Sequence, residues 1–283
     1  MQTPGQSAAA PSPQPAGRGQ LNAALITGTI VGALGGLLFG FDTAVISGTT
    51  SALTHVYQLS PKLLGVTVFS ALVGTIFGAM LAAFPGERYG RRDSLRILGV
   101  LYVVSAVGCA FAWNWDALVA FRFIGGLGIG GSSVLGPMYI AEIAPARLRG
   151  RLVGLFQFCV VFGILLAYFS NYLIGLAHFG TAGWRWMFGV AAIPAIVFFL
   201  LLFGIPRSPR WLVKKGRVEE ARAVLRTLGD EHYEQDLQEI VESVHLEQRQ
   251  TQEPLFSRKF KLPIFLAVTI GMFNQLSGIN AIL

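Results

Sequence analysis

The chain has 283 residues, of which 53% are hydrophobic and only 13% are charged. Soluble domains carry about 25% charged residues, so this composition excludes an ordinary soluble protein and indicates a membrane protein. The net charge of +7 does not indicate a nucleic-acid-binding protein, because the basic residues gather in alternate loops, as the topology of a membrane protein requires.

Six long apolar segments follow an N-terminal stretch of different composition. Residues 1–20 are rich in Pro, Gln, Ala and Gly, which predicts a disordered tail. A helix needs about 20 apolar residues to cross a bilayer. We therefore expect an all-α bundle of six membrane helices within residues 21–205, and the start of a second transmembrane half at 263–283, cut short inside a seventh span. The six expected spans are 24–47, 61–84, 95–113, 117–139, 152–174 and 185–205.

The basic residues indicate how these spans are oriented. They gather in alternate connections, and positively charged connections face the cytoplasm. The sequence therefore predicts a multi-pass protein in the bilayer of the cell membrane, with its N-terminus and its even-numbered connections cytoplasmic. The basic connections contain Arg88, Arg91, Arg92 and Arg96 after span two, Arg147, Arg149 and Arg151 after span four, and many residues from Arg207 to Lys261 after span six.

Residues 206–262 are predicted to form a cytoplasmic helical linker. Two stretches place apolar residues on one helical face and charges on the other, and Gly229 is a plausible end for the first helix. These helices are too short to enclose a catalytic core, so we interpret them as a packing platform beneath the bundle. The two apolar faces contain Ala221, Val224, Leu225 and Leu228, then Leu237, Ile240, Val241 and Val244.

A single carboxylate, Asp42, lies in the middle of the first apolar span. A charge at that depth costs roughly 2.5–3.5 kcal/mol and is seldom kept unless it faces a partner, a cavity or an ion pathway. The partner that we expect is Arg122, deep in the fourth span. The pair would form a switch if a proton on Asp42 releases Arg122 and the loss of that proton restores the pair. The alternative is a static ion pair that only fixes helix packing.

Glycines are dense in the same two spans. The segment from Gly126 to Gly130 resembles a nucleotide-binding glycine pattern, but it follows no predicted strand and opens no soluble helix. Close approach of neighbouring membrane helices explains these glycines better.

Amide and aromatic side chains indicate a polar site between the spans. Carboxamides both donate and accept hydrogen bonds, as sugar hydroxyls do, and aromatic rings offer flat faces to a sugar ring. Together they favour a pocket for a polar solute near the membrane midplane, although each amide alone is equally well explained as an interhelical hydrogen bond. The residues are Phe39, Phe41, Gln157, Trp186, Asn274, Gln275 and Asn280.

No catalytic constellation stands out in the sequence. There is no Ser–His–Asp set, no pair of carboxylates and no metal-ligand spacing, and the four histidines are far apart. We therefore expect no enzyme activity, no cofactor, no metal site and no nucleic-acid partner.

Seven motifs follow one another in a specific order. They are GGLLFGFDTAVISG (35–48), RYGRRDSL (88–95), RFIGGLGIGG (122–131), PMYIAEIAPARLRGRL (137–152), GWRWMF (183–188), PRSPRWL (206–212) and NQLSGINA (274–281). In this order they resemble the sugar porter family of the major facilitator superfamily, and bacterial sugar–proton symporters most. The similarity covers about residues 24–283, and the family's second signature is complete. Its members here are Gly126, Gly130, Tyr139, Glu142 and Arg149.

The resemblance implies proton-coupled symport of a monosaccharide by alternating access. It implies that Asp42 is the proton-coupling carboxylate and that Arg122 is its partner. Gln157, Gln275 and Asn280 align with residues that bind sugar hydroxyls, and Phe39 and Asn274 join them as candidates for the substrate site. A cytoplasmic charge network that latches the two halves in the outward-facing state is implied for Glu87, Arg91, Arg92, Glu142, Arg149 and Arg210.

The chain departs from the family pattern at several positions. Arg207 stands where the family has Glu, so the latch loses an acid and gains a base. Asn274 replaces a Gln, which affects the expected sugar preference. Ala83 and Glu87 replace the usual Gly and Asp of the loop between spans two and three.

The largest departure from the family is length. Such a transporter has two six-helix halves with the site between them, and this chain contains one half, the linker and part of the seventh helix. We expect a fragment of a complete transporter, which needs the missing C-terminal half or a second copy of the chain. The alternatives are a facilitative uniporter and a sugar-sensing or half-transporter membrane protein that carries nothing.

Overall fold

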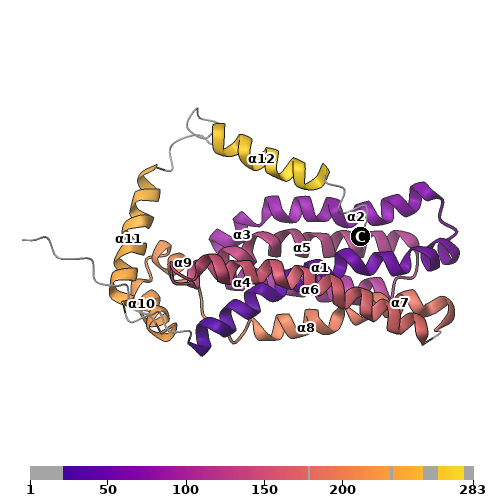
Figure 1. Ribbon diagram of the computed structural model, residues 1–283, viewed down its shortest axis with the longest axis horizontal. Coiled ribbons are helices and arrows are strands. Elements are labelled where there is room, and N and C mark those ends of the chain that lie inside the picture. Colours follow the sequence, from indigo (N-terminus) through magenta and orange to yellow (C-terminus); the bar gives the residue numbers. More distant parts are fainter. Residues whose placement is uncertain (1–21, 178, 230–231, 251–260, 277–283) are drawn as a thin grey trace, which may run out of the picture.

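The computed structural model describes residues 22–177, 179–229, 232–250 and 261–276. The tail at 1–20 therefore lies outside the described residues, and within them the chain is helical and contains no strand. Six stretches are long and apolar enough to cross a membrane, and Figure 1 shows them side by side in one elongated bundle. They are α1 (Ala23–Tyr57), α2 with α3 (Pro61–Leu81 and Ala83–Arg88), α4 (Arg91–Ala110), α5 (Trp115–Ile143), α6 (Arg149–Leu176), and η1 with α7 and α8 (Gly180–Ala182, Gly183–Val190 and Ala192–Leu201).

Polar caps mark where several of these helices begin. Asn22 accepts a hydrogen bond from the backbone of Ala24 at the start of α1, and Asn114 accepts one from Ala117 at the start of α5. Ser60 caps α2 and is followed by proline at the first helical position. Such side chains satisfy backbone N–H groups that have no partner inside the helix, so the sequence itself fixes these boundaries.

Two prolines explain the interruptions within the second and sixth spans. The break between α2 and α3 lies three residues before Pro85, and the break between α7 and α8 lies three residues before Pro194. Proline has no N–H to donate and its ring clashes with the preceding turn, so it kinks or breaks a helix.

Glycines allow two pairs of helices to pack backbone against backbone. A methyl group at Gly40 of α1 would overlap the backbone of Val160 in α6, and one at Gly130 of α5 would overlap the backbone of Thr75 in α2. Small residues permit such close approach between membrane helices. The prediction that these glycines serve helix packing is therefore confirmed.

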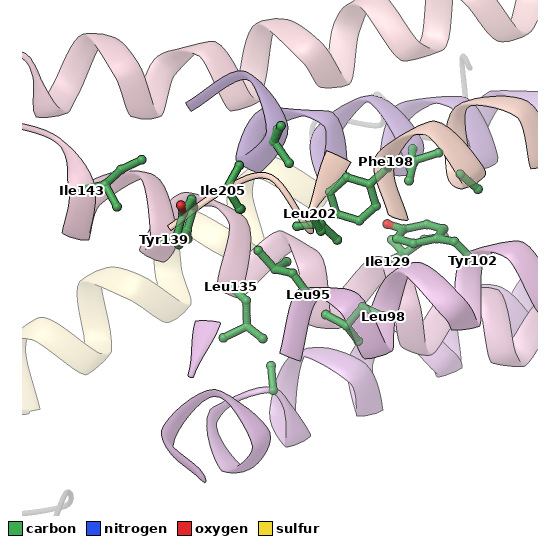
Figure 2. Close-up of a cluster of buried hydrophobic side chains, with 14 of the residues drawn as sticks. Leu95, Leu98, Tyr102, Ile129, Leu135, Tyr139, Ile143, Phe198, Leu202 and Ile205 are labelled. Carbon is green, nitrogen blue, oxygen red and sulfur yellow. The ribbon is translucent and has the colours of Figure 1, made fainter. Parts of the chain in front are cut away.

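Figure 2 shows the main apolar core, which lies between α4, α5 and the segment around α8. The rings of Tyr102 and Phe198 meet edge to face, with centroids 6.4 Å apart and planes at 90°. The Tyr139 hydroxyl donates a hydrogen bond to the Pro206 carbonyl at 2.9 Å. The core therefore continues from the bundle into the start of the linker.

Three helices follow the sixth span and lie at one end of the bundle (Figure 1). They are α9 (Pro209–Lys214), α10 (Val218–Thr227) and α11 (Tyr233–Gln250), and we call this end of the bundle the linker end. Ala221, Leu225, Leu237 and Val244 are buried in one cluster, so the two predicted amphipathic faces pack together. Gly229, with φ of +79°, follows α10. The last described helix is α12 (Lys261–Leu276), at the start of the expected seventh span.

Candidate functional site

Asp42 of α1 and Arg122 of α5 form an ion pair inside the bundle. Asp42 Oδ1 lies 3.5 Å from Arg122 Nη1. The Arg122 side chain is 3% exposed and the Asp42 side chain is 22% exposed. The structure therefore brings together the two charges that the sequence analysis paired, and it leaves the carboxylate the more accessible of the two.

The Arg122 guanidinium is poorly satisfied for a buried charge. Its Nε and Nη1 atoms have no hydrogen-bond partner among the described residues, and its Cζ lies 5.6 Å from the ring centroid of Phe188. Charge-assisted N–H···O bonds are usually about 2.7–2.9 Å long, so the contact with Asp42 is loose. Buried polar atoms without partners are costly, so the fold keeps this charge inside the bundle at a cost in free energy.

The candidate substrate residues are only partly placed by the structure. Phe39 is half-buried and packs against a cluster that α1, α5 and α6 share, in which Phe156 and Val160 are the α6 members. Gln157 lies between these two residues in sequence and is exposed, and its side chain forms no hydrogen bond within the described part of the chain. Packing of α1 on α6 thus brings Phe39 to the segment that carries Gln157.

The structure does not describe the side chains of the three other candidates for the substrate site. Asn274 and Gln275 belong to α12, but the positions of their side chains lie outside what the structure describes. Asn280 lies outside the described residues altogether.

The prediction that Phe41 faces a solute is wrong. Phe41 is 3% exposed and belongs to a buried cluster with Val45 and Trp184. Two positions along a helix correspond to a rotation of about 200°, so Phe39 and Phe41 point to nearly opposite sides of α1. Trp186 is 56% exposed and stacks on Phe179 with ring centroids 5.6 Å apart.

A buried ion pair joins the start of α4 to the end of α5 at the linker end. Arg91 Nη2 lies 2.9 Å from Glu142 Oε1, and both side chains are 8% exposed. Arg91 Nη1 also donates to the Gly86 carbonyl at 2.9 Å. Two residues predicted for the charge network therefore meet directly, and they hold α3, α4 and α5 together.

Asp93 is the centre of a second charge cluster, which the sequence analysis missed. Its carboxylate accepts hydrogen bonds from Arg92 at 3.1 Å, Arg96 at 2.8 Å and Arg207 at 3.0 Å. Arg92 also donates to the carbonyl of Ile205 at 3.2 Å. The signal was present in the sequence, because Asp93 directly follows two arginines and precedes Arg96 by three positions, a spacing at which helical side chains meet.

Within the part of the chain that the structure describes, the other predicted charges form no ion pair with one another. Arg210 pairs with Glu247 of α11. Lys214 lies 3.5 Å from Glu247 and 3.9 Å from Glu87. Arg149 is exposed and lines a cavity of about 510 Å³ together with Glu142 and Arg210. The charges at the linker end thus form three local groups and line a cavity, rather than forming one continuous set of six residues.

Comparisons with known proteins identify the family of this chain. Residues 28–283 match the family model described as "Sugar (and other) transporter". The D-xylose-proton symporter of Escherichia coli is 41% identical over 90% of this chain and 58% of its own length. The arabinose-proton symporter of Bacillus subtilis is 38% identical over 88% of this chain and 55% of its own length.

A solved structure shows the same fold. The partially occluded, inward open conformation of the xylose transporter XylE from Escherichia coli matches with a TM-score of 0.83 and 39% identity, over 92% of this chain and 65% of that one. The chain spans about half the length of the curated relatives that it matches. It belongs to the sugar porter family of the major facilitator superfamily, and it corresponds to the N-terminal half of the family's proteins.

Proposed function

We propose that this chain is the N-terminal half of a secondary transporter that carries a monosaccharide together with a proton. Two relatives with about 40% identity are described as sugar–proton symporters. The observation that carries the proposal is the loose contact between Asp42 and the deeply buried Arg122. A carboxylate within the bundle is an acceptor for a proton, and its charge is coupled directly to the contact between α1 and α5.

In the proposed cycle, a proton from the outside neutralises Asp42 and weakens its attraction to Arg122. Sugar then binds through Gln157, with Gln275 and Asn280 completing the site. The two halves of the transporter rock, the proton leaves toward the inside and the ion pair forms again. The membrane potential contributes about 2.3 kcal/mol per elementary charge per 100 mV, which drives accumulation of the sugar.

The partner of this bundle is proposed to be a second set of six helices, either further along the same protein or in a second copy. In the α6 span, only 22% of an 18-residue apolar stretch is buried. In the α2 span, the buried share of such a stretch is 33%. Apolar faces are therefore left for lipid and for the partner half. In this arrangement the N-terminus and the linker end face the cytoplasm, where the Arg91–Glu142 pair stabilises one of the two conformations.

Substitution of Asp42 by Asn tests the proposal in the complete transporter reconstituted in liposomes. Asparagine keeps the shape but neither ionises nor takes up a proton, so we expect concentrative uptake to be abolished while sugar exchange at equal concentrations continues. Asp116→Asn, an exposed position at the start of α5, is the matched control and should keep both activities.

Two results would contradict the proposal. One is that the Asp42→Asn transporter still concentrates sugar. The other is that sugar added to cells with the unaltered transporter fails to make the medium more alkaline, which is the behaviour expected of a facilitative uniporter.

A further inference from the structure

A small cavity lies beside the Asp42 carboxylate, enclosed by α1, α4, α5 and the junction of α7 with α8. Its volume is about 20 Å³. A cavity needs about 10–15 Å³ to hold one water molecule, so this space is large enough for an ordered water. The lining residues include Asp42, Tyr102, Ser105, Gly125, Ala191 and Ala195.

The polar groups of this cavity come from α1 and α4. Tyr102 and Ser105 are 6% and 5% exposed, and both line the space with the Asp42 side chain. A methyl group at Gly125 would overlap Ser105 Oγ, so the glycine leaves room for the hydroxyl at this wall. Three side chains that carry oxygen atoms therefore line the space, and most of the other lining residues are apolar.

The direction of one hydrogen bond decides what Tyr102 offers to the cavity. Ser132 Oγ donates to the carbonyl of Ile129 at 3.1 Å, and the Tyr102 hydroxyl lies 2.7 Å from the same Ser132 Oγ. Because a hydroxyl has a single proton, Ser132 accepts the bond from Tyr102. The oxygen of Tyr102 then keeps free lone pairs, and it is available as an acceptor.

The Asp42 carboxylate beside the cavity accepts no hydrogen bond from the part of the chain that the structure describes. Its contact with Arg122 is 3.5 Å long, and Arg122 itself does not line the cavity. Buried polar groups without protein partners are commonly satisfied by ordered water, which forms about three hydrogen bonds.

We propose that this cavity is a binding site for one ordered water molecule, which donates hydrogen bonds to the Asp42 carboxylate and to the Tyr102 oxygen and accepts one from the Ser105 hydroxyl. The count of three bonds matches that of a typical buried water. Hard divalent cations such as Ca²⁺ need six or more oxygen ligands, which this cavity does not supply.

The role of this water rests on the proposed function, although its presence does not. When Arg122 moves away from Asp42, the water still supplies a donor to the carboxylate. The small side chains of Ala191 and Ala195 leave the space that it needs. The space for the water therefore depends on two residues that belong neither to the ion pair nor to the candidate sugar site.

A crystal structure of the chain at a resolution that shows ordered waters tests the site directly. We expect one water within hydrogen-bond distance of Asp42 and Ser105. Ala195→Val places two further methyl groups in the cavity and should expel the water. Ala192→Val is the matched control, because Ala192 does not line the cavity, and it should keep the water. If Ala195→Val does not fold, Ala191→Val replaces it.

An empty cavity in the unaltered chain, or a water that remains at the same position in both cavity-filling variants, would overturn the site. In the complete transporter, Ala195→Val should lower concentrative uptake by about tenfold relative to Ala192→Val, the expected effect of losing one hydrogen bond to a charged group. Equal uptake would overturn the role but leave the site. Failure of the proton-coupling proposal shows instead in Asp42→Asn, which does not depend on the water.

Discussion

Arg207 Nη2 donates a hydrogen bond to Asp93 Oδ2 at 3.0 Å, and this contact joins the start of α4 to the segment between α8 and α9. The resemblance to sugar porters led us to expect a lost acid at position 207. In the structure the arginine there has its own partner, because Asp93 lies opposite it. A glutamate at this position would bring a second carboxylate toward Asp93. The charge of residue 207 therefore decides whether the linker forms an attractive contact with the start of α4.

We expect Asp93→Asn to destabilise the chain more than Arg207→Gln. Loss of the carboxylate leaves the guanidinium groups of Arg92, Arg96 and Arg207 close together without an anion, which we expect to cost about 1–3 kcal/mol. Loss of Arg207 removes one partly exposed pair, worth about 0.2–1 kcal/mol. Thermal unfolding in detergent, followed by tryptophan fluorescence, measures both. A larger loss for Arg207→Gln would contradict the central role of Asp93.

The Arg91–Glu142 pair provides a second prediction, because both side chains are only 8% exposed. Glu142→Ala leaves a buried guanidinium without its carboxylate, which typically costs about 3–5 kcal/mol. Replacing both residues by apolar side chains, as Arg91→Met with Glu142→Leu, should recover most of that loss. The same unfolding measurement applies, and a double variant as unstable as Glu142→Ala would show that the two residues are not energetically coupled.

Two glycines offer a matched test of helix packing. Gly130→Ala forces a methyl group against the backbone of Thr75, whereas a methyl group at Gly65 of α2 meets nothing within 4 Å. We expect Gly130→Ala to lower the free energy of unfolding by about 1–3 kcal/mol, as overpacking does. Gly65→Ala should raise it by about 0.5–1 kcal/mol through better helix propensity. Similar melting temperatures for the two variants would mean that α2 and α5 separate easily.

The sequence predicted the number of membrane helices and the Asp42–Arg122 pair because each depends on strong local signals. A long apolar run that crosses a membrane forms a helix, because its backbone polar groups must be hydrogen-bonded within the segment. Two charges of opposite sign inside such helices pair with each other or with another polar group. The breaks before Pro85 and Pro194 were not predicted, although proline lacks the N–H that a helix interior needs.

The partners of the network at the linker end were harder to predict. Arg210 meets Glu247 because α11 folds back on α9, and this arrangement depends on tertiary packing that no local pattern encodes. Phe41 was misplaced for a related reason. Both Phe39 and Phe41 are apolar residues in an apolar helix, so the sequence does not distinguish the face toward a solute from the face toward the core.

The pair Arg217 and Glu220 predicts an effect of pH outside the membrane. Arg217 Nε donates a hydrogen bond to Glu220 Oε1 at 2.5 Å, and this bond lowers the pKa of Glu220 below its ordinary value. A carboxyl group with a lowered pKa stabilises the folded state above its ordinary pKa, and the effect disappears as the pH falls through the folded value. A carbon NMR titration of Glu220 should therefore show its pKa returning toward the ordinary value in Arg217→Ala. An unchanged titration would mean that the contact is not populated.

Gln157 provides a prediction for sugar binding in the complete transporter. Its side chain is exposed beside the cluster against which Phe39 packs, and it forms no hydrogen bond within the described part of the chain. Gln157→Ala should therefore weaken sugar binding by about 2- to 10-fold, the effect of one lost hydrogen bond, and leave the melting temperature unchanged. Gln238→Ala on α11 makes the same substitution at an exposed position and should change neither quantity. Binding is measured by isothermal titration with the purified transporter. If Gln157→Ala lowers the melting temperature while the affinity stays constant, the amide stabilises the fold and does not contact the sugar.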